Sequence, residues 1–481
     1  MQDKELSKKI FSGMKWKAFE RLFLQIINAV TPMVLARLLL PEDFGIVSIL
    51  GVFISIGNTF VNNGLCDSII QKKDSDIIDC STVFYTQLII AVICYFLLYV
   101  SAPLISQMYN NKELTPMLRV MSLSLIIGSF RSMQTTIMKK NMNFYKSFWV
   151  QSISTISYGV VGIYAAYAGM GCWSLVYASI AKSVISTICA NIVVRWRPSI
   201  NFSFERLKSL FSYSYKLTVG WLIGTLHQDV YTLVIGKMFS NATLGYYNRA
   251  GSFPQIITKT VTEVVDGVMF PALSRIQEDK KELKSVTRGL LSFNSYVLFP
   301  IFMGLAAAGD NIVSLILTEK WLPSVPMMRI MCMTFALNSI NNSNMQVFNS
   351  MGRSDLFMKF EIVKRSLSIV LLFAVSFISI YAVIVVLLFM AILSNCMNAY
   401  QNKKLLNYKY FEFLYDIFPN IIISLIMAVC VFFVGKLFAM RIVSLAVQIL
   451  AGVLIYILLS AVTKNDSFTK LIHMIKEKIR G

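Results

Sequence analysis

LARLLLPEDFG, residues 35–45, closes a long apolar run with a base, a proline, two acidic residues and Gly45. The stretch VIGKMFSNATLG at residues 234–245 repeats this pattern of an apolar helix end, a base and a glycine. The bases and the final glycines of the two stretches lie at one offset of 200 residues. This interval indicates an internal repeat, and the alternative is coincidence between two short segments.

A second echo favours the repeat. QTTIMKKNMNF begins at Gln134 and QVFNSMGRSDLF begins at Gln346, an offset of 212 residues. The offset grows because the connection PALSRIQEDKKELKSV, residues 271–286, is longer than its counterpart in the first half. Two repeats of six membrane spans each have the same orientation and are related by an axis along the membrane normal, as in parallel-repeat transporters.

Composition assigns the chain to the membrane. Hydrophobic residues make up 56% of it and charged residues only 15%, whereas a soluble domain carries about a quarter charged residues. A span needs roughly 20 predominantly apolar residues, and such stretches recur along the chain. We predict an all-α polytopic membrane protein with about 14 transmembrane helices, as two repeats of six helices each and two C-terminal helices. The expected spans are 13–37, 44–69, 81–107, 114–138, 144–168, 171–195, 210–236, 243–270, 286–308, 326–350, 356–379, 381–401, 412–435 and 441–462.

The spans divide the chain into five parts. We predict an N-lobe, an inter-lobe cytoplasmic linker, a C-lobe, a final helix pair and a cytoplasmic amphipathic tail. They cover residues 1–197, 198–209, 210–404, 405–463 and 464–481.

Lys and Arg gather in alternate connections, which sets the orientation because such residues accumulate on the cytoplasmic side. The pattern predicts that both termini are cytoplasmic. Basic loops beside anionic headgroups also explain the net charge of +20 without nucleic acid as a partner. The eight cysteines form no CxxC pair, and the two histidines, His227 and His473, lie far apart, so we predict neither a metal site nor a cofactor.

Three blocks carry a family resemblance: LARLLLPEDFGIVS at 35–48, LGYYNRAGSFPQ at 244–255 and FNSMGRSDL at 348–356. They resemble the polysaccharide-transport branch of the MOP superfamily, the Wzx-type flippases of colanic and teichuronic acid synthesis. The resemblance implies two six-helix lobes around a central cavity, with two further C-terminal helices, and a non-enzymatic activity. The bases inside the spans predict that this cavity is cationic. That activity is the movement of undecaprenyl-pyrophosphate-linked oligosaccharide from the cytoplasmic to the outer leaflet of the bacterial inner membrane, by alternating access. It implies surface polysaccharides such as exopolysaccharide or O-antigen as the end product, and membrane lipids and the polysaccharide polymerase machinery as partners. No shared feature fixes the sugar.

Charged residues inside the spans are the candidate site, because a base facing lipid at mid-helix costs about 2.5 to 3.5 kcal/mol on insertion scales. The bases that could bind a pyrophosphate or sugar are Lys182, Arg249, Arg119, Arg329, Lys259, Arg131 and Lys216. Guanidinium and ammonium groups replace the water that a diphosphate gives up.

The bases differ in depth. Lys182 lies near the middle of its span, where reaching the headgroups is hardest, and it is the first candidate. Arg119, Arg249 and Arg329 lie near the outer span ends, where snorkelling to the headgroups is the alternative. Arg131 and Lys216 lie near the cytoplasmic ends of their spans. Either they bind the headgroup on the cytoplasmic side, or they are part of the general excess of Lys and Arg on that side.

Other polar residues have two readings each. Lys259, Glu263 and Asp266 share one helix face, either as an internal ion pair or as a site for substrate or ion. Asp229 is a candidate for coupling to H⁺ or Na⁺, and Glu263 and Asp266 join it; a helix–helix hydrogen bond is the alternative for Asp229. The run NSINNSNMQVFN is too polar for a lipid face, so its amides line the cavity or bond neighbouring helices: Asn338, Asn341, Asn342 and Gln346.

Two rival functions remain open. A MATE-like cation-coupled antiporter of drugs or organic cations would share the fold, but we expect its cavity to be acidic and aromatic. A membrane glycosyltransferase or polymerase would need a sizeable acidic catalytic loop at the membrane surface, and the chain has none. The sugar, the coupling ion and the oligomeric state stay open at this stage.

Overall fold

The computed structural model describes residues 16, 23–62, 64–352, 354–470, 472 and 477. Every regular element in these ranges is a helix. After an apolar helix over Phe23–Leu38, the elements are α2 (Pro41–Asn62), α3 (Leu65–Gln71), α4 (Ile77–Met108), α5 (Leu114–Lys140), α6 (Phe144–Tyr167), α7 (Trp173–Val193), α8 (Phe204–Met238), α9 (Asn241–Arg275), α10 (Lys280–Ala307), α11 (Gly309–Ile316), η1 (Glu319–Ser324), α12 (Val325–Ser350), α13 (Ser354–Val375), α14 (Ile380–Leu406), α15 (Tyr410–Lys436) and α16 (Arg441–Val462).

Helices occupy each range in which a span is expected after the first one. Several helices extend beyond the expected spans, and three differences concern the course of the chain. The second span is split into α2 and α3 at Gly64, whose φ of 65° is open to glycine at little cost. Helix α8 begins at Phe204 rather than 210, because the Ser203 side chain caps it by accepting from the Arg206 N–H. The short helices α11 and η1, which hydropathy did not predict, follow α10.

Seven helices among the described residues are long and apolar enough to cross a membrane, α4, α15 and α16 among them. The others of similar length, such as α5, α8 and α12, carry more polar and charged residues. Many of these polar side chains bond neighbouring helices. The amphipathic tail predicted at 464–481 is described over 464–470, 472 and 477, and its segment from Asp466 to Lys470 is helical.

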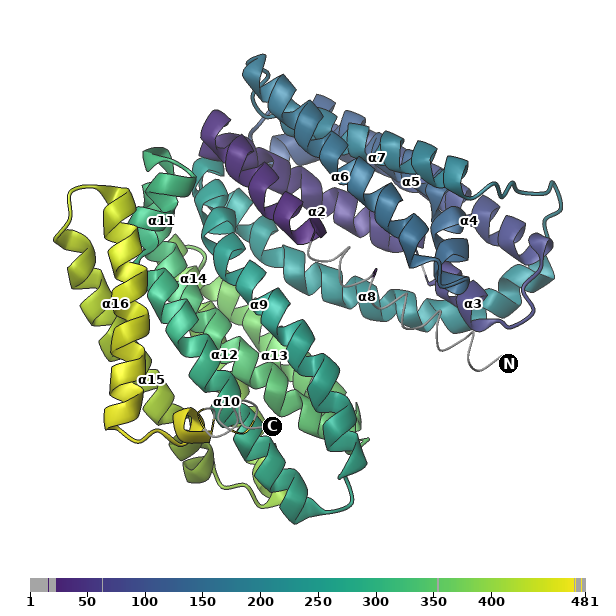
Figure 1. The fold of residues 1–481 in the computed structure, drawn as a ribbon. Coiled ribbons are helices and arrows are strands. Elements are labelled where there is room, and N and C mark those ends of the chain that lie inside the picture. The colour runs from purple at the N-terminus through teal and green to yellow at the C-terminus, as the bar shows by residue number, and fades with distance from the viewer. Residues whose placement is uncertain are drawn as a thin grey trace. The chain divides into compact units, whose positions relative to one another are not determined.

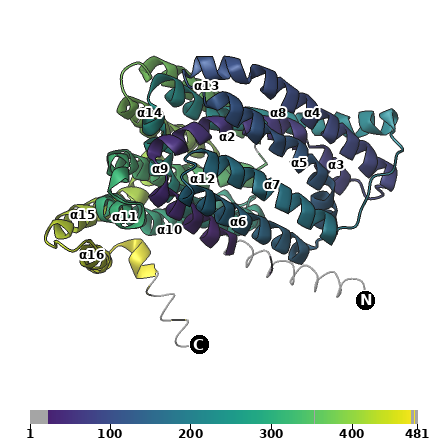
Figure 2. The ribbon, with the colours of Figure 1, turned by 90° about the horizontal axis from the view of Figure 1, so that it is seen from above.

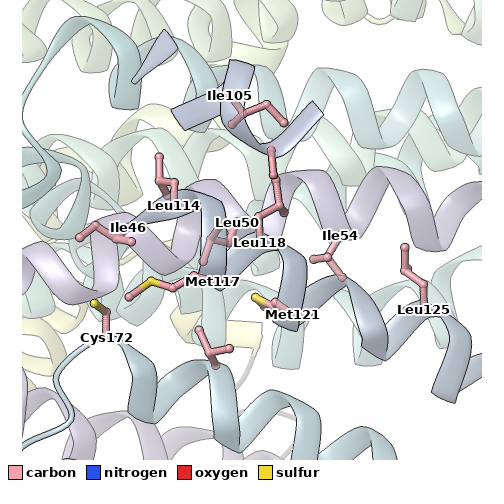
Figure 3. Close-up of a cluster of buried hydrophobic side chains, with 12 residues drawn as sticks. Ile46, Leu50, Ile54, Ile105, Leu114, Met117, Leu118, Met121, Leu125 and Cys172 are labelled. Atoms are coloured by element: carbon pink, nitrogen blue, oxygen red, sulfur yellow. The ribbon is translucent and has the colours of Figure 1, made fainter. Parts of the chain in front are cut away.

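The chain divides into two compact units, unit 1 (Met1–Gly245) and unit 2 (Tyr246–Gly481). In unit 1, α5 packs on α4 and α7, α6 packs on α7, and α2 packs on α8 (Figure 1). A buried apolar cluster joins four of these helices: Leu50 and Ile54 of α2, Ile105 of α4 and Met117 of α5 meet beside Cys172, which precedes α7 (Figure 3).

In unit 2, α10 is the central helix, and α12 and α15 pack against it while α14 packs on α12 (Figures 1 and 2). Polar side chains attach the last helix pair. Asn420 of α15 donates to the Ser295 hydroxyl of α10 over 2.7 Å, and the Tyr456 hydroxyl of α16 donates to the Tyr296 carbonyl over 2.7 Å. In a bilayer such bonds stabilise helix association where apolar burial contributes little.

The two glycines of the opening repeat meet in unit 1. Helices α2 and α9 begin at Pro41 and Asn241, the same offset of 200 as in the sequence. A Cβ on Gly45 would lie 1.9 Å from the Asn241 carbonyl oxygen, and a Cβ on Gly245 would lie 2.0 Å from the Pro41 carbonyl oxygen. The contact is therefore reciprocal, and each helix start needs the glycine of the other.

Substituting either glycine tests this contact. We expect Gly45→Ala and Gly245→Ala each to lower the free energy of unfolding by about 1–3 kcal/mol, because a backbone carbonyl must move away from the new methyl group. Thermal unfolding in detergent measures the effect. Gly51→Ala, on the same helix with no atom within 4 Å of a Cβ, is the control and should raise the melting temperature slightly. Equal melting of all three variants would refute the close contact.

An ion-pair network ties the start of α8 to the start of α4. The guanidinium of Arg206 lies 2.5 Å from an Asp76 carboxylate oxygen and 3.3 Å from Asp79, and Lys72 lies 2.6 Å from Asp79. The hydrogen bond from Arg206, with a second from the Asp79 backbone N–H, lowers the pKa of Asp76 to about 2. A lowered carboxyl pKa contributes stability above the ordinary value that is lost as the pH falls through the folded value.

The pH dependence follows from that pKa. We expect Asp76→Asn to lower the melting temperature at pH 7, and the difference from wild type to shrink between about pH 4 and pH 2, as the wild-type carboxyl becomes protonated. Melting curves over this pH range measure it. Asp74→Asn removes the same charge from an exposed neighbour and serves as the control. If the two melting temperatures still differ by the same amount at pH 2, the stabilisation by Asp76 does not come from its charge.

Candidate functional site

Lys182, the first candidate of the sequence analysis, lies near the middle of α7. Its ammonium lies 5.8 Å from the Tyr158 ring centroid of α6, at the edge of cation–π range. The like charge of Arg131 acts on it from α5. Arg131 donates to the Ser186 hydroxyl over 2.5 Å. Thus two predicted site residues, Lys182 and Arg131, come together, and neither forms an ion pair within the described ranges.

Helices α5 and α7 carry these cations on an interface held by polar bonds. Ser183 donates to the Ser124 carbonyl over 3.3 Å, and Thr187 donates to the Ile127 carbonyl over 2.9 Å. Hydroxyls on α7 thus bond the backbone of α5, which fixes the register of the two helices. Ser186 lies one turn from Lys182 on the same face, a spacing that could have marked it as a site residue from the sequence.

Asp229 of α8 faces α2. It accepts a hydrogen bond from the Ser55 side chain, and one turn away the hydroxyls of Thr225 and Thr59 lie 3.2 Å apart. The second carboxylate oxygen of Asp229 is buried and has no hydrogen-bond partner among the described residues. An ionised oxygen in this position is costly, so a proton or a cation is its natural partner. No local pattern points to Ser55, because its role depends on the packing of α2 against α8.

The remaining bases of unit 1 lie apart from this pair. Arg119 donates to the Tyr99 carbonyl over 3.3 Å and stacks 4.1 Å from the Tyr99 ring, so it binds α5 to α4. Lys216 of α8 is exposed, with its ammonium 5.9 Å from the Tyr215 ring.

In unit 2 the predicted bases are separate from one another. Arg329 donates to the Asp310 carboxylate over 2.6 Å and to the Ala306 carbonyl over 3.2 Å, so its charge is compensated. Arg249 lies 5.4 Å from the ring of the buried Trp321. Lys259 is exposed on α9. Glu263 and Asp266 are on the same helix, but their side chains lie outside the described residues.

The asparagine-rich run of α12 divides into two faces. One face bonds α14: Asn398 donates to the Asn341 side-chain oxygen over 2.6 Å, and Asn402 donates to that of Asn344 over 3.0 Å. Asn341 thus makes the interhelical bond that the sequence left as its alternative. The other face consists of Asn338, Asn342 and Gln346, spaced one turn apart and half-buried; in the described part of the chain they have no hydrogen-bond partner. These amides are available to a ligand.

No group of three or more His, Cys, Asp or Glu side chains that could hold a metal occurs among the described residues. Every cysteine there is a free thiol, and burial raises the pKa of Cys172, just before α7, to about 12.

The model of the polysaccharide biosynthesis protein family matches residues 34–326. The chain belongs to this family. The lipopolysaccharide biosynthesis protein WzxC of Escherichia coli (strain K12) is 24% identical over 366 residues, which cover 76% of this chain and 74% of WzxC. The teichuronic acid biosynthesis protein TuaB of Bacillus subtilis (strain 168) is 23% identical over 354 residues, which cover 73% of each chain.

A solved structure of the lipid II flippase MurJ, in an inward closed conformation, matches with a TM-score of 0.75 at 15% identity and covers 93% of this chain and 98% of that one. At this identity the likeness shows the fold, an all-α multi-span membrane fold. Together the family and the fold confirm the resemblance to the polysaccharide-transport branch of the MOP superfamily. Members of this family are multi-pass membrane transporters, not enzymes.

Proposed function

We propose that the protein flips an undecaprenyl-pyrophosphate-linked oligosaccharide from the cytoplasmic to the outer leaflet by alternating access, with both termini cytoplasmic. The relatives named for lipopolysaccharide and teichuronic acid synthesis, and the lipid II flippase with the same fold, favour a lipid-linked glycan as cargo. The observation that carries the proposal is the pair of Lys182 and Arg131, two neighbouring cations without an acidic partner in the described ranges.

A diphosphate suits this pair. Burying two like charges costs free energy that a dianion between them would offset, and charge-assisted hydrogen bonds to phosphate are among the strongest in proteins. The fully buried Ser186 hydroxyl holds the Arg131 guanidinium in place, and the Tyr158 ring lies beside the Lys182 ammonium. An organic cation, the cargo of the rival antiporter, would be repelled here.

Unit 2 contributes features that suit the other parts of such a cargo. The unpartnered amides of Asn338, Asn342 and Gln346 suit sugar hydroxyls, because an amide offers both a donor and an acceptor. An apolar groove of about 480 Å³ between α10, α15 and α16, with Pro300, Met427 and Gly452 in its wall, suits part of a polyprenyl chain. Isoprene units bind such carbon-lined surfaces through burial alone.

Flipping of a defined lipid-linked oligosaccharide in reconstituted vesicles tests the proposal. We expect Lys182→Ala to slow flipping about 10- to 100-fold, the loss of one hydrogen bond to a charged group, and Lys182→Arg to retain most of the rate. Lys403→Ala, which removes an exposed base far along the chain, is the control. Normal flipping by Lys182→Ala, or drug efflux without lipid movement, would refute the proposed site or the function.

We further propose that Asp229 couples flipping to a proton or sodium gradient. In Asp229→Asn the amide oxygen still accepts from Ser55, but the group no longer binds a proton or a cation. We expect this variant to fold with a normal melting temperature and to flip at a rate that no longer responds to an imposed gradient of pH or sodium. A gradient response equal to wild type, with a lowered melting temperature, would show that Asp229 is only a helix–helix contact.

A further inference from the structure

A hollow of about 950 Å³ in unit 1 lies between α4, α5, α7 and the segment of residues 195–198 that follows α7. It lies at the end of the unit that also carries Lys72 and Arg206 of the ion-pair network, because Trp196 packs into the same apolar cluster as Leu207 of α8. Its wall combines aromatic rings, two amides and two arginines, and no acidic residue lines it. This composition differs from that of the apolar groove in unit 2.

One wall residue has an unmet acceptor. Gln134 of α5 is only 2% exposed, and its side-chain nitrogen donates to the Asn191 oxygen over 2.6 Å. Its own side-chain oxygen is buried and accepts from no described residue. A buried amide oxygen without a donor costs free energy, so a ligand hydroxyl that donates here would be favoured.

Two uncompensated cations flank the same hollow. Arg195 and Arg197 are exposed, and within the described ranges their side chains form no ion pair or hydrogen bond. The neighbouring bases of this end are engaged: Arg206 and Lys72 bind Asp76 and Asp79. A guanidinium pair in this state favours phosphate, which accepts two parallel bonds from each group.

The segment that carries these arginines is held in place. The Trp196 ring packs at 67° against the Phe84 ring of α4, with centroids 5.8 Å apart. The Ser199 N–H donates to the Ser81 hydroxyl over 2.9 Å, and the Ser203 N–H donates to the Thr82 hydroxyl over 3.2 Å. A fixed segment loses little conformational freedom when a ligand binds, which favours affinity.

Hydrocarbon borders the hollow. Phe130 of α5 is 42% exposed and Ile192 of α7 is 68% exposed, and both line it. On a membrane protein such side chains face acyl chains. A ligand for this place therefore joins an anionic head to a hydrocarbon tail.

We propose that this hollow binds the phosphorylated, hydroxyl-bearing headgroup of a membrane lipid. Arg195 and Arg197 bind the phosphate, and the Gln134 oxygen accepts a hydrogen bond from a headgroup hydroxyl. Gln134 lies about one turn along α5 from Arg131, so this site adjoins the proposed transport site but does not share its cations. Two kinds of lipid carry both groups: a phosphoglycerol lipid of the bulk membrane, and a polyprenyl-linked glycan, with its pyrophosphate and the attached sugar. Only the second source rests on the proposed function.

Native mass spectrometry of the full chain in detergent tests the proposal, with phosphatidylglycerol as the hydroxyl-bearing probe and phosphatidylmethanol, a phosphodiester of the same charge, as the probe without headgroup hydroxyls. We expect the double variant Arg195→Gln, Arg197→Gln to weaken binding of both probes about 10- to 30-fold. Gln134→Met should weaken phosphatidylglycerol binding several-fold and leave phosphatidylmethanol binding unchanged. The double variant Lys73→Gln, Lys403→Gln, which removes two exposed bases elsewhere, is the matched control.

The result decides between outcomes. Wild-type binding of both probes by the arginine variant would overturn the proposal, even if Gln134→Met fails to fold, because the two arginines are exposed and dispensable for packing. Equal losses for the two probes in Gln134→Met would overturn the hydroxyl contact. Repeating the titration with a polyprenyl-pyrophosphate disaccharide identifies the source: a stronger arginine dependence than that of phosphatidylglycerol assigns the hollow to the transported lipid. Because the readout is binding, a failed flipping assay leaves this test intact.

Discussion

The reciprocal contact of Gly45 and Gly245 sets the positions from which the rest of unit 1 is built. Each glycine lies against the backbone carbonyl at the start of the other helix, at distances where any side chain would collide. The contact brings α2 onto the turn between α8 and α9 and so fixes the register of α2 on α8. About 15 Å further along α2, at a rise of 1.5 Å per residue, that register places Ser55 against Asp229. The hydrogen bond between Ser55 of α2 and Asp229 of α8 therefore depends on the close approach at Gly45 and Gly245.

The polar groups inside the helices fall into two kinds. One kind is satisfied by a neighbouring helix, as in Asn398 with Asn341 or Arg329 with Asp310. These groups stabilise the packing of the helices and have no capacity left for a ligand. The other kind lacks a partner among the described residues: the Lys182 and Arg131 charges, and the oxygen of Gln134. Because an unmet polar group in a bilayer is costly, its persistence points to a ligand that is absent from the chain itself.

Hydropathy was enough to predict the long helices, because it depends only on the residues of one segment. The split at Gly64 depends on a single left-handed residue and escaped that analysis. Whether a polar side chain bonds another helix or stays available to a ligand depends on its neighbours in space. Asn341 and Asn342 are adjacent in the sequence, yet only the first meets α14, since they face different sides of α12. Arg329 is paired by Asp310, which lies on a short helix that no apolar pattern marked.

Gln134 and Gln346 began the second sequence echo, and both have acceptor capacity that no described residue uses. Transport gives a reason for leaving them unmet. A carrier must bind its cargo strongly enough to take it from one leaflet and weakly enough to release it into the other. Two cations and separate amides meet this condition better than a ring of fixed ion pairs. Each contact adds a modest amount of binding free energy, which a change of conformation can remove.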